Sequence, residues 1–158
     1  MGIIIRRAME SDAVAACDVV RRSISELCVA DHCNNEATLT AWLENKSVDT
    51  FLRLIRAESK SCVVAILDDN ICGFGHIDHS GAIGLLYVAP DARFLGASTA
   101  MLGWLEDEAF RLGVKAVTLN SSLTAREFYM ARGYALAGEP IAGFGITQAW
   151  PMSKQLTL

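Results

Sequence analysis

A short stretch in the middle of the chain combines a strand, a proline and a helix start in an order suited to anion binding. Residues 86–99 read LYVAPDARFLGAST, and the predicted strand ends at Pro90, which has no amide hydrogen to donate. The loop that follows carries Arg93, and small residues open the next helix from Gly96. The first turn of a helix has unpaired amide hydrogens and about half a positive charge, so small side chains there let an anion reach the backbone. The stretch predicts a phosphate cradle, with an ordinary loop and helix start as the alternative.

Histidines and cysteines supply the other reactive side chains. His76 and His79 flank a predicted turn, and either could remove a proton near neutral pH. The alternative is a histidine that packs in a strand or turn and binds water. Cys28, His32 and Cys33 lie close together, but a structural zinc site needs four ligands in paired spacings. We therefore expect no metal there, and instead buried thiols beside a surface histidine.

The composition is that of one globular domain, which we expect to span residues 1–158. The chain has 158 residues, of which 52% are hydrophobic and 20% charged, and this composition excludes a disordered chain or a disulfide-stapled miniprotein. Its formal net charge of −4 has the wrong sign for general binding to nucleic acid or to an acidic membrane. Any anionic ligand must therefore be held by a local site.

The start of the chain and its cysteines predict a cytoplasmic protein. The charges of the first seven residues, MGIIIRR, follow the apolar run, which is the wrong order for a signal peptide. No apolar run approaches the roughly 18 residues that a membrane helix needs. The five cysteines are an odd number with no Cys-x-x-Cys pair, so we expect free thiols in a reducing compartment.

Hydrophobic periodicity predicts the elements that must position the cradle. In chain order these are a strand at 3–7, a helix at 13–27, two helical pieces within 34–60, strands at 62–67, 71–77 and 82–89, a helix from 96 to 112, a strand at 115–119, a helix at 125–132, and weak strands at 134–136 and 146–152. The three central strands, separated by short runs of turn residues, predict an antiparallel meander. The strand, helix and strand from 82 to 119 predict a parallel pair. The fold class is α/β, a mixed central sheet with helices on both faces.

The cradle resembles the phosphate loop of the GNAT superfamily of acyl-CoA-dependent N-acyltransferases. That loop reads Gln/Arg-x-x-Gly-x-Gly/Ala after a strand that ends in Val-x-Pro. Arg93, Gly96 and Ser98 occupy its key positions, with Ser98 in place of the usual Gly or Ala. The resemblance implies that the meander and a splayed parallel strand pair form a GNAT-like sheet.

A second block of the chain resembles the same family. The family pattern places Ala before Phe-Tyr and then Gly-Phe or Gly-Tyr, and the chain has Ala125, Phe128-Tyr129 and Gly133-Tyr134. Ser122 stands where the family commonly has Asn, three residues before the alanine. Two blocks in register, separated by a helix and a strand, are far more specific than either alone.

The resemblance implies acetyl-CoA as the acyl donor, bound without a metal. Backbone groups of the strand before Pro90 would pair with the pantetheine arm, and the amides of the loop and helix start would hold the pyrophosphate. The implied cofactor-binding residues are Leu86, Tyr87, Val88, Arg93, Phe94, Leu95, Gly96, Ala97, Ser98, Thr99 and Ser122.

The resemblance also implies the chemistry. It aligns Tyr129 with a tyrosine beside the CoA sulfur, where a phenol could donate to the leaving thiolate, whereas a packing role is the alternative. The Val88 amide could stabilise the oxyanion. The family's frequent glutamate base aligns with Val117, which leaves His76 or water as the base.

The expected function is transfer of an acetyl group to a primary amine by direct attack in a ternary complex. The expected partner is a small-molecule or peptide amine, with neither nucleic acid nor membrane. The alternative function is a non-catalytic acyl-CoA-binding sensor or interaction module. The acceptor cannot be identified from the sequence, and a homodimer is an open expectation from the family.

Overall fold

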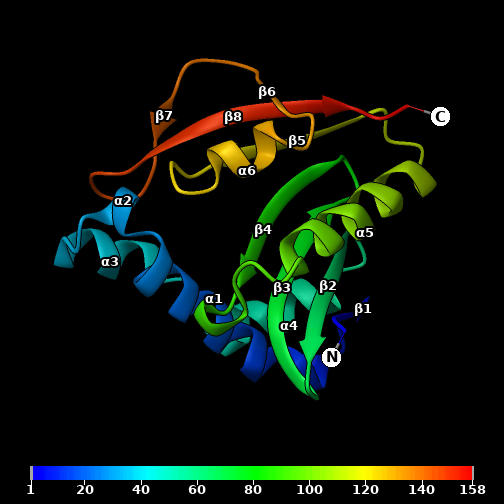
Figure 1. Cartoon of the computed structure of the whole chain (residues 1–158), viewed down its shortest axis with the longest axis horizontal. Coiled ribbons are helices and arrows are strands. Elements are labelled where there is room, and N and C mark those ends of the chain that lie inside the picture. Colours follow the sequence, from blue (N-terminus) through cyan, green and yellow to red (C-terminus); the bar gives the residue numbers. More distant parts are fainter. Residues whose placement is uncertain (1, 158) are drawn as a thin grey trace.

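One mixed β-sheet forms the framework of the molecule (Figure 1). The computed structural model describes residues 2–157. The strand order is β1-β2-β3-β4-β5-β8-β6, and β7 pairs with β8. The strands are β1 (Ile4–Arg7), β2 (Lys60–Leu67), β3 (Asn70–Asp78), β4 (Ala82–Val88), β5 (Ala116–Ser121), β6 (Ala135–Leu136), β7 (Ile141–Ala142) and β8 (Gln148–Gln155).

Six α-helices and two short 3-10 turns connect these strands in the described part of the chain. The helices are α1 (Ala13–Leu27), α2 (Val29–His32), α3 (Glu36–Leu43), α4 (Val48–Arg56), α5 (Ala97–Arg111) and α6 (Arg126–Met130), and the 3-10 turns are η1 (Glu10–Asp12) and η2 (Pro90–Ala92). The element order confirms the sequence prediction, apart from the short α2 and β7, which periodicity did not indicate. The four residues of α2 and the two of β7 are too few for hydrophobic periodicity to be recognised in the sequence. Among residues 2–157, no helix has the length and apolar character needed to cross a membrane.

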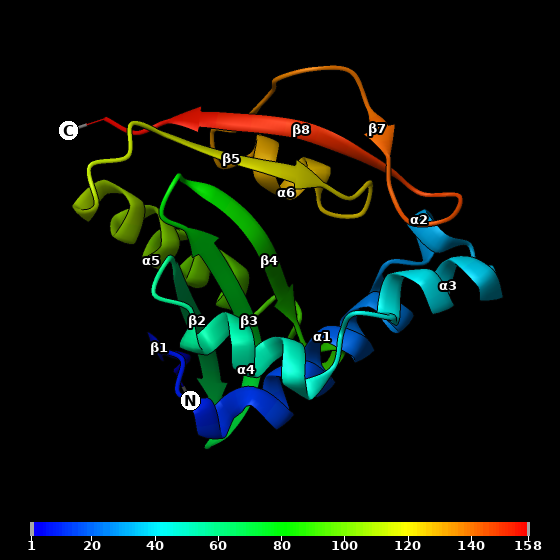
Figure 2. The ribbon, with the colours of Figure 1, turned by 180° about the vertical axis from the view of Figure 1, so that it is seen from behind.

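Helices cover both faces of the meander, as predicted (Figure 2). On one face α1 and α4 pack over β2 and β3, and the rings of Phe51 and Phe74 meet edge to face at 5.0 Å. On the other face α5 buries Met101 and Leu105 completely. The helix is one residue shorter at each end than the predicted range 96–112, because Gly96 caps it and it ends at Arg111.

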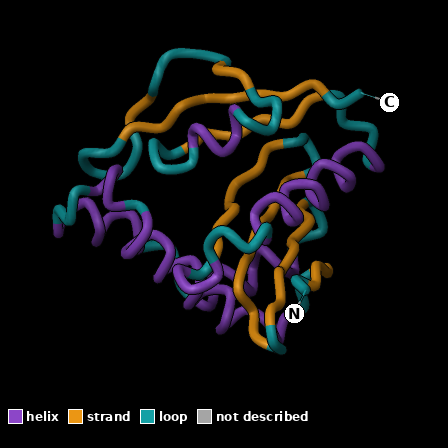
Figure 3. The backbone as a smooth tube through the Cα atoms, viewed as in Figure 1, coloured by secondary structure: helices purple, strands orange, loops and turns teal. Residues whose placement is uncertain are grey.

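The parallel pair separates almost as soon as it forms, so the predicted splay is confirmed. β4 and β5 share two residue pairs, Ala82 with Thr118 and Ile83 with Leu119. The ladder between β3 and β4 shifts register immediately afterwards, and Gly84 is the extra residue on β4. A bulge bends its strand and increases the local twist. Beyond this point β4 turns away from β5, which continues beside β8 (Figure 3).

Gly81 holds the start of the parallel pair. Its φ is +99°, its carbonyl accepts a hydrogen bond of 2.9 Å from the Thr118 amide, and an added Cβ would lie 2.7 Å from the Ala116 carbonyl oxygen. Both the backbone conformation and the close approach therefore require glycine here.

We expect Gly81→Ala to lower the free energy of unfolding by about 2 to 4 kcal/mol, because both the strained φ and the backbone clash must be accommodated. Urea denaturation measures this value. Gly103→Ala is the matched control: a Cβ at Gly103 within α5 meets nothing within 4 Å, so it should stabilise the protein by about 0.5 to 1 kcal/mol. Equal stability of Gly81→Ala and the wild type would show that this junction is not constrained.

Candidate active site

A cavity of about 530 Å³, called here the first cavity, opens where β4 leaves β5. Its walls come from the end of α1, from β4, from the loop before α5 and the first turn of α5, and from the end of β5 and the α6 region. Most of the residues expected to bind the cofactor line it: Leu86, Tyr87, Val88, Arg93, Phe94, Gly96, Ala97, Ser98, Thr99 and Ser122. Tyr129 lines it as well, whereas Leu95 and His76 do not.

The register of β4 determines which backbone groups face this cavity. The Ala89 amide donates to the Cys72 carbonyl at 2.8 Å, and residue pairs in an antiparallel ladder alternate between bonded and non-bonded. Tyr87, two residues earlier, therefore directs its N–H and C=O toward β3. The N–H and C=O of Leu86 and Val88 point the opposite way, toward the space that β5 has left. An extended ligand that carries amides could add to this edge as a strand does.

The first turn of α5 forms an open cradle at one end of the first cavity. Gly96 caps the helix with φ +86°, and a Cβ placed there would meet nothing within 4 Å. The first turn contains no acidic residue, so the positive end of the helix dipole is not cancelled locally. The exposed Arg93 guanidinium lies 4.6 Å from the centre of the Phe94 ring.

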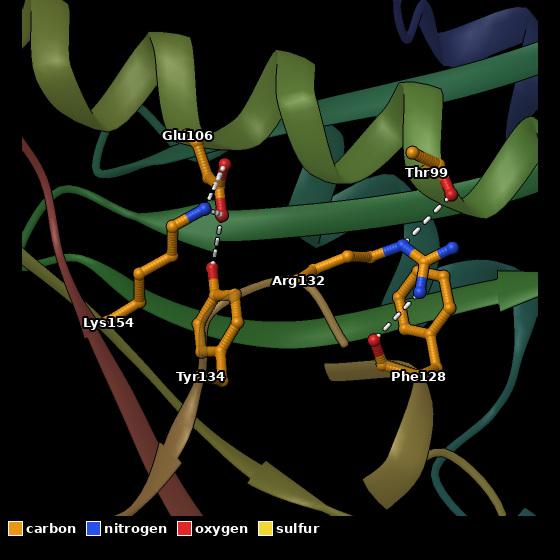
Figure 4. Close-up of polar contacts among 6 residues, drawn as sticks. All are labelled: Thr99, Glu106, Phe128, Arg132, Tyr134 and Lys154. Carbon is orange, nitrogen blue, oxygen red and sulfur yellow. Dashed lines mark hydrogen bonds and ion pairs between the residues drawn. The ribbon is translucent and has the colours of Figure 1, made fainter. Parts of the chain in front are cut away.

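Arg132 is a second cation in the cavity wall, and the sequence analysis missed it. Its Nε donates to Thr99 Oγ1 at 3.0 Å and its Nη1 to the Phe128 carbonyl at 2.8 Å (Figure 4). The guanidinium also stacks 3.8 Å from the centre of the Phe128 ring. Arg132 thus ties the α6 region to the first turn of α5. Its place before Gly133, at the end of a predicted helix, did not distinguish it from an ordinary solvated charge.

Glu106 forms a second tie from α5, two turns further along the helix. Its carboxylate accepts a hydrogen bond of 2.7 Å from the Tyr134 hydroxyl and pairs with Lys154 Nζ at 3.1 Å (Figure 4). Burial and the adjacent carboxylate raise the pKa of Tyr134. These contacts join α5 to Tyr134, just before β6, and to Lys154 on β8.

Tyr129 is buried, with its ring edge to face against Phe128 at 5.2 Å and Tyr134 at 5.5 Å. Burial raises its pKa well above the ordinary value. The phenol therefore stays protonated at neutral pH, so it cannot act as a base but can donate a hydrogen bond or a proton.

A second cavity, of about 590 Å³, meets the first at the divergence of the strands. It lies between the α2–α4 region and the loop from β7 to β8. The residues that line both cavities are Gly84, Leu85, Tyr87, Asn120 and Ser122. Groups bound in the two cavities could thus approach each other at the bulge.

His76 lines the second cavity beside this junction. The Cε1 and Nε2 atoms of its ring occupy the space that a Cβ on Gly84 would fill, so the glycine makes room for the imidazole. Its buried Nδ1 has no hydrogen-bond partner among residues 2–157. Burial lowers the pKa of His76 to about 4, with Lys60 adding to this effect and Asp78 opposing it. The imidazole is therefore neutral at physiological pH.

Asp31 positions the loop that leads to α6. Its carboxylate accepts hydrogen bonds from the Leu123 amide at 2.7 Å, the Thr124 amide at 3.1 Å and Thr124 Oγ1 at 2.5 Å. Ser122 Oγ in turn accepts from the Ala125 amide at 3.1 Å. The sequence analysis did not single out Asp31, because no local pattern indicates a contact between residues 92 positions apart. Asp31 also lies on α2, a helix that the sequence did not predict.

The expected surface position of His32 is wrong. Its side chain is completely buried, Nε2 lies 3.0 Å from the Ile24 carbonyl, and Nδ1 accepts from the Asn34 amide. Among its neighbours Cys28 is buried but Cys33 is exposed, and all five cysteines are free as predicted. Across residues 2–157, no group of three or more His, Cys, Asp or Glu side chains is arranged to hold a metal.

Comparison with known proteins identifies the class of protein to which this fold belongs. The sequence profile described as acetyltransferase (GNAT) domain matches residues 26–156. The chain belongs to this family. It is a GNAT acetyltransferase, an enzyme whose family uses acetyl-CoA. A sequence comparison with curated proteins gave no significant match.

Solved structures share the fold over almost the whole chain. A GCN5-related N-acetyltransferase from Rhodopseudomonas palustris is 23% identical, with a TM-score of 0.86 over 99% of this chain and 97% of that one. The PaiA N-acetyltransferase from Thermoplasma acidophilum, in complex with coenzyme A, is 20% identical, with a TM-score of 0.83 over 99% and 100%. An aminoglycoside 6'-acetyltransferase type Ii is 19% identical, with a TM-score of 0.72 over 96% of each chain.

The shifted pKa of His76 predicts a pH dependence of stability. Between its ordinary pKa of 6.5 and the folded value of about 4, the unfolded chain binds a proton that the folded chain excludes. The contribution of His76 to stability therefore falls as the pH drops through this range, by at most about 1.4 kcal/mol per pH unit. His76→Gln should lose stability less steeply than the wild type in urea denaturation between about pH 7 and pH 4.5. Parallel pH curves for the two proteins would contradict the assigned pKa.

Proposed function

We propose that the first cavity binds acetyl-CoA, that the second binds a primary amine, and that the amine attacks the thioester directly in a ternary complex. The observation that carries this proposal is the meeting of the two cavities at the divergence of β4 and β5. Family membership favours this enzymatic function over a non-catalytic sensor. We further propose that residues 1–158 act as a single acetyltransferase domain.

The residues of the first cavity fit coenzyme A. The N–H and C=O groups of Leu86 and Val88 face the gap and suit the amides of a pantetheine arm. The cradle at Gly96 is open and carries the positive end of the α5 dipole, which suits a pyrophosphate. Arg93 and Arg132 add positive charge at this end of the cavity.

Holding acetyl-CoA and the amine side by side would supply much of the rate enhancement. Acetyl-CoA supplies an activated acyl group, so no covalent enzyme intermediate is needed. The new nitrogen–carbon bond forms as the carbon–sulfur bond breaks, and the amine proton ends on the thiol or in solvent. The protein must orient the two reactants and stabilise the charge that develops on the acyl oxygen. The Val88 amide, on the open edge of β4, is the proposed donor to that oxygen.

Tyr129 and His76 have complementary proposed roles. Tyr129 is protonated and lines the first cavity, so it can donate to the departing sulfur. His76 is neutral and lines the second, so it can accept a hydrogen bond from the incoming amine. Its low pKa makes it a weak base, and water would carry the proton onward. Val117, where the family often has glutamate, is completely buried on β5.

The cradle assignment predicts the effect of two substitutions on acetyl-CoA affinity, measured by calorimetry. Arg93→Ala should weaken binding by about 10 to 150-fold, the usual cost of one charge-assisted contact. Gly96→Trp should weaken it more by filling the cradle. Gly103→Trp, on α5 but outside the cavity lining, is the matched control and should change affinity less than about twofold. Unchanged affinity in a folded Gly96→Trp protein would refute the site.

The acid assignment predicts that Tyr129→Phe lowers turnover by about tenfold to a few hundredfold, with acetyl-CoA affinity within about threefold of the wild type. The effect is moderate because a thiolate already leaves well. Release of free CoA thiol, with an amine found by screening, provides the rate. The ring and its packing are retained, so near-normal turnover would mean that Tyr129 only packs against Phe128 and Tyr134.

A further inference from the structure

The charged side chains that line the second cavity are Asp31 and Lys46, and both are buried. The carboxylate of Asp31 is already used within the protein, because both of its oxygens accept hydrogen bonds from Leu123 and Thr124. A cationic ligand would have to compete with these contacts. Lys46 is therefore the charge that the cavity offers to a substrate.

Lys46 has no opposite charge within the part of the chain that the structure describes. No carboxylate of residues 2–157 lies within ion-pair distance of its Nζ, whose polar contacts are neutral: the Trp42 carbonyl at 3.3 Å and Asn45 Oδ1 at 2.6 Å. An ammonium group has three donors, so one remains. Burial lowers the pKa of Lys46, and Arg21 acts in the same direction. A buried cation without a counter-charge is costly, and an anionic ligand would relieve that cost.

The backbone of Lys46 is held firmly in place. Its carbonyl accepts a hydrogen bond from Arg21 Nη1 at 2.8 Å and one from Cys17 Sγ at 3.3 Å, and its amide donates to the Leu43 carbonyl at 3.0 Å. These contacts fix the turn between α3 and α4 against α1. The ammonium group is thus presented to the cavity from a rigid support, as a recognition site requires.

An apolar wall lies beside this cation. The rings of Trp42 and Phe144 stack with their centres 5.9 Å apart and an angle of 14° between planes, and both line the second cavity. Lys46 Nζ lies 5.2 Å from the centre of the Phe144 ring. The cavity therefore places one cation next to a flat aromatic surface, and Asp31, the other charged side chain of its lining, is already hydrogen-bonded to Leu123 and Thr124.

We propose that the acceptor amine also carries a carboxylate, as an amino acid or a similar compound does, and that this carboxylate binds Lys46 while an apolar part of the acceptor packs on Trp42 and Phe144. The inference rests on the proposed function and names the substrate class of the second cavity. It disfavours polycationic acceptors, because Lys46 would repel them and the carboxylate of Asp31 is already occupied.

The direct experiment compares acids with their amides in the wild-type enzyme. Acetylation of the twenty common amino acids is measured beside that of each one's carboxamide, with spermidine and kanamycin as polycationic acceptors. We expect kcat/KM for the preferred acid to exceed that of its amide by about 10 to 150-fold, the worth of one charge-assisted contact. A carboxamide lowers the pKa of the neighbouring amine and frees more of it to react, so kcat/KM is expressed per unprotonated amine for both compounds.

A variant that removes the charge of Lys46 distinguishes recognition of the carboxylate from a purely structural role of this residue in the α3–α4 turn. Lys46→Gln should raise KM for the preferred acid by about 10 to 150-fold, leave kcat within about threefold, and reduce the acid-to-amide ratio to below about three. The exposed Lys115→Gln is the matched control and should leave that ratio unchanged. A merely structural Lys46 would affect acid and amide equally, and this outcome would overturn the inference.

The remaining outcomes distinguish this inference from the function on which it rests. Preferential acetylation of carboxamides, spermidine or kanamycin by the wild type would overturn the carboxylate site and leave the amine acetyltransferase standing. Binding of acetyl-CoA without acetylation of any amine in the panel would count against the proposed transfer, and the carboxylate site would fall with it.

Discussion

β4 and β5 pair at Ala82–Thr118 and Ile83–Leu119, and the two strands then separate. Backbone N–H and C=O groups inside a protein need partners, so an opened strand edge demands either a ligand or water. Here the alternation of the β3–β4 ladder directs the polar groups of Leu86 and Val88 to that edge. The bulge at Gly84 produces the separation and also accommodates the ring of His76. One backbone irregularity therefore accompanies the opening of the β4 edge and leaves room for a side chain of the second cavity.

Polar contacts hold the two diverging parts of the sheet at a fixed spacing. Arg132 joins the α6 region to Thr99 on α5, and Glu106 joins the same helix to Tyr134 and Lys154. Asp31 attaches α2 to the loop after β5. The side chains of Asp31, Glu106, Tyr134 and Lys154 are at least partly buried, so their hydrogen bonds are less screened than surface pairs, whereas the Arg132–Thr99 bond is exposed. In the proposed ternary complex, such a frame would hold the two ligands in a defined orientation.

Burial sets the protonation state of each group around the junction. A low dielectric disfavours charge, so His76 is neutral, Tyr129 keeps its proton, and the pKa of Lys46 is lowered. The first cavity receives positive charge from the α5 N-terminus and two arginines, whereas the second offers a single lysine beside an aromatic wall. The two cavities thus differ in charge, which agrees with the proposed binding of an extended polyanion in the first and of a small, partly apolar anion in the second.

The sequence by itself determined the element order, the meander, the helix start at Gly96 and the placement of Tyr129 in a family block, because periodicity, turn residues and contiguous motifs are local properties. It also indicated the free cysteines. Tertiary structure alone decided that His32 is buried, that Arg132 reaches Thr99, that Asp31 holds residues 123 and 124, and that Lys46 lies beside Phe144. Except for the burial of His32, these features are contacts between residues that lie 33 to 98 positions apart in the sequence. Such proximity depends on how the helices pack and where the strands diverge, and neither leaves a spacing pattern in the chain.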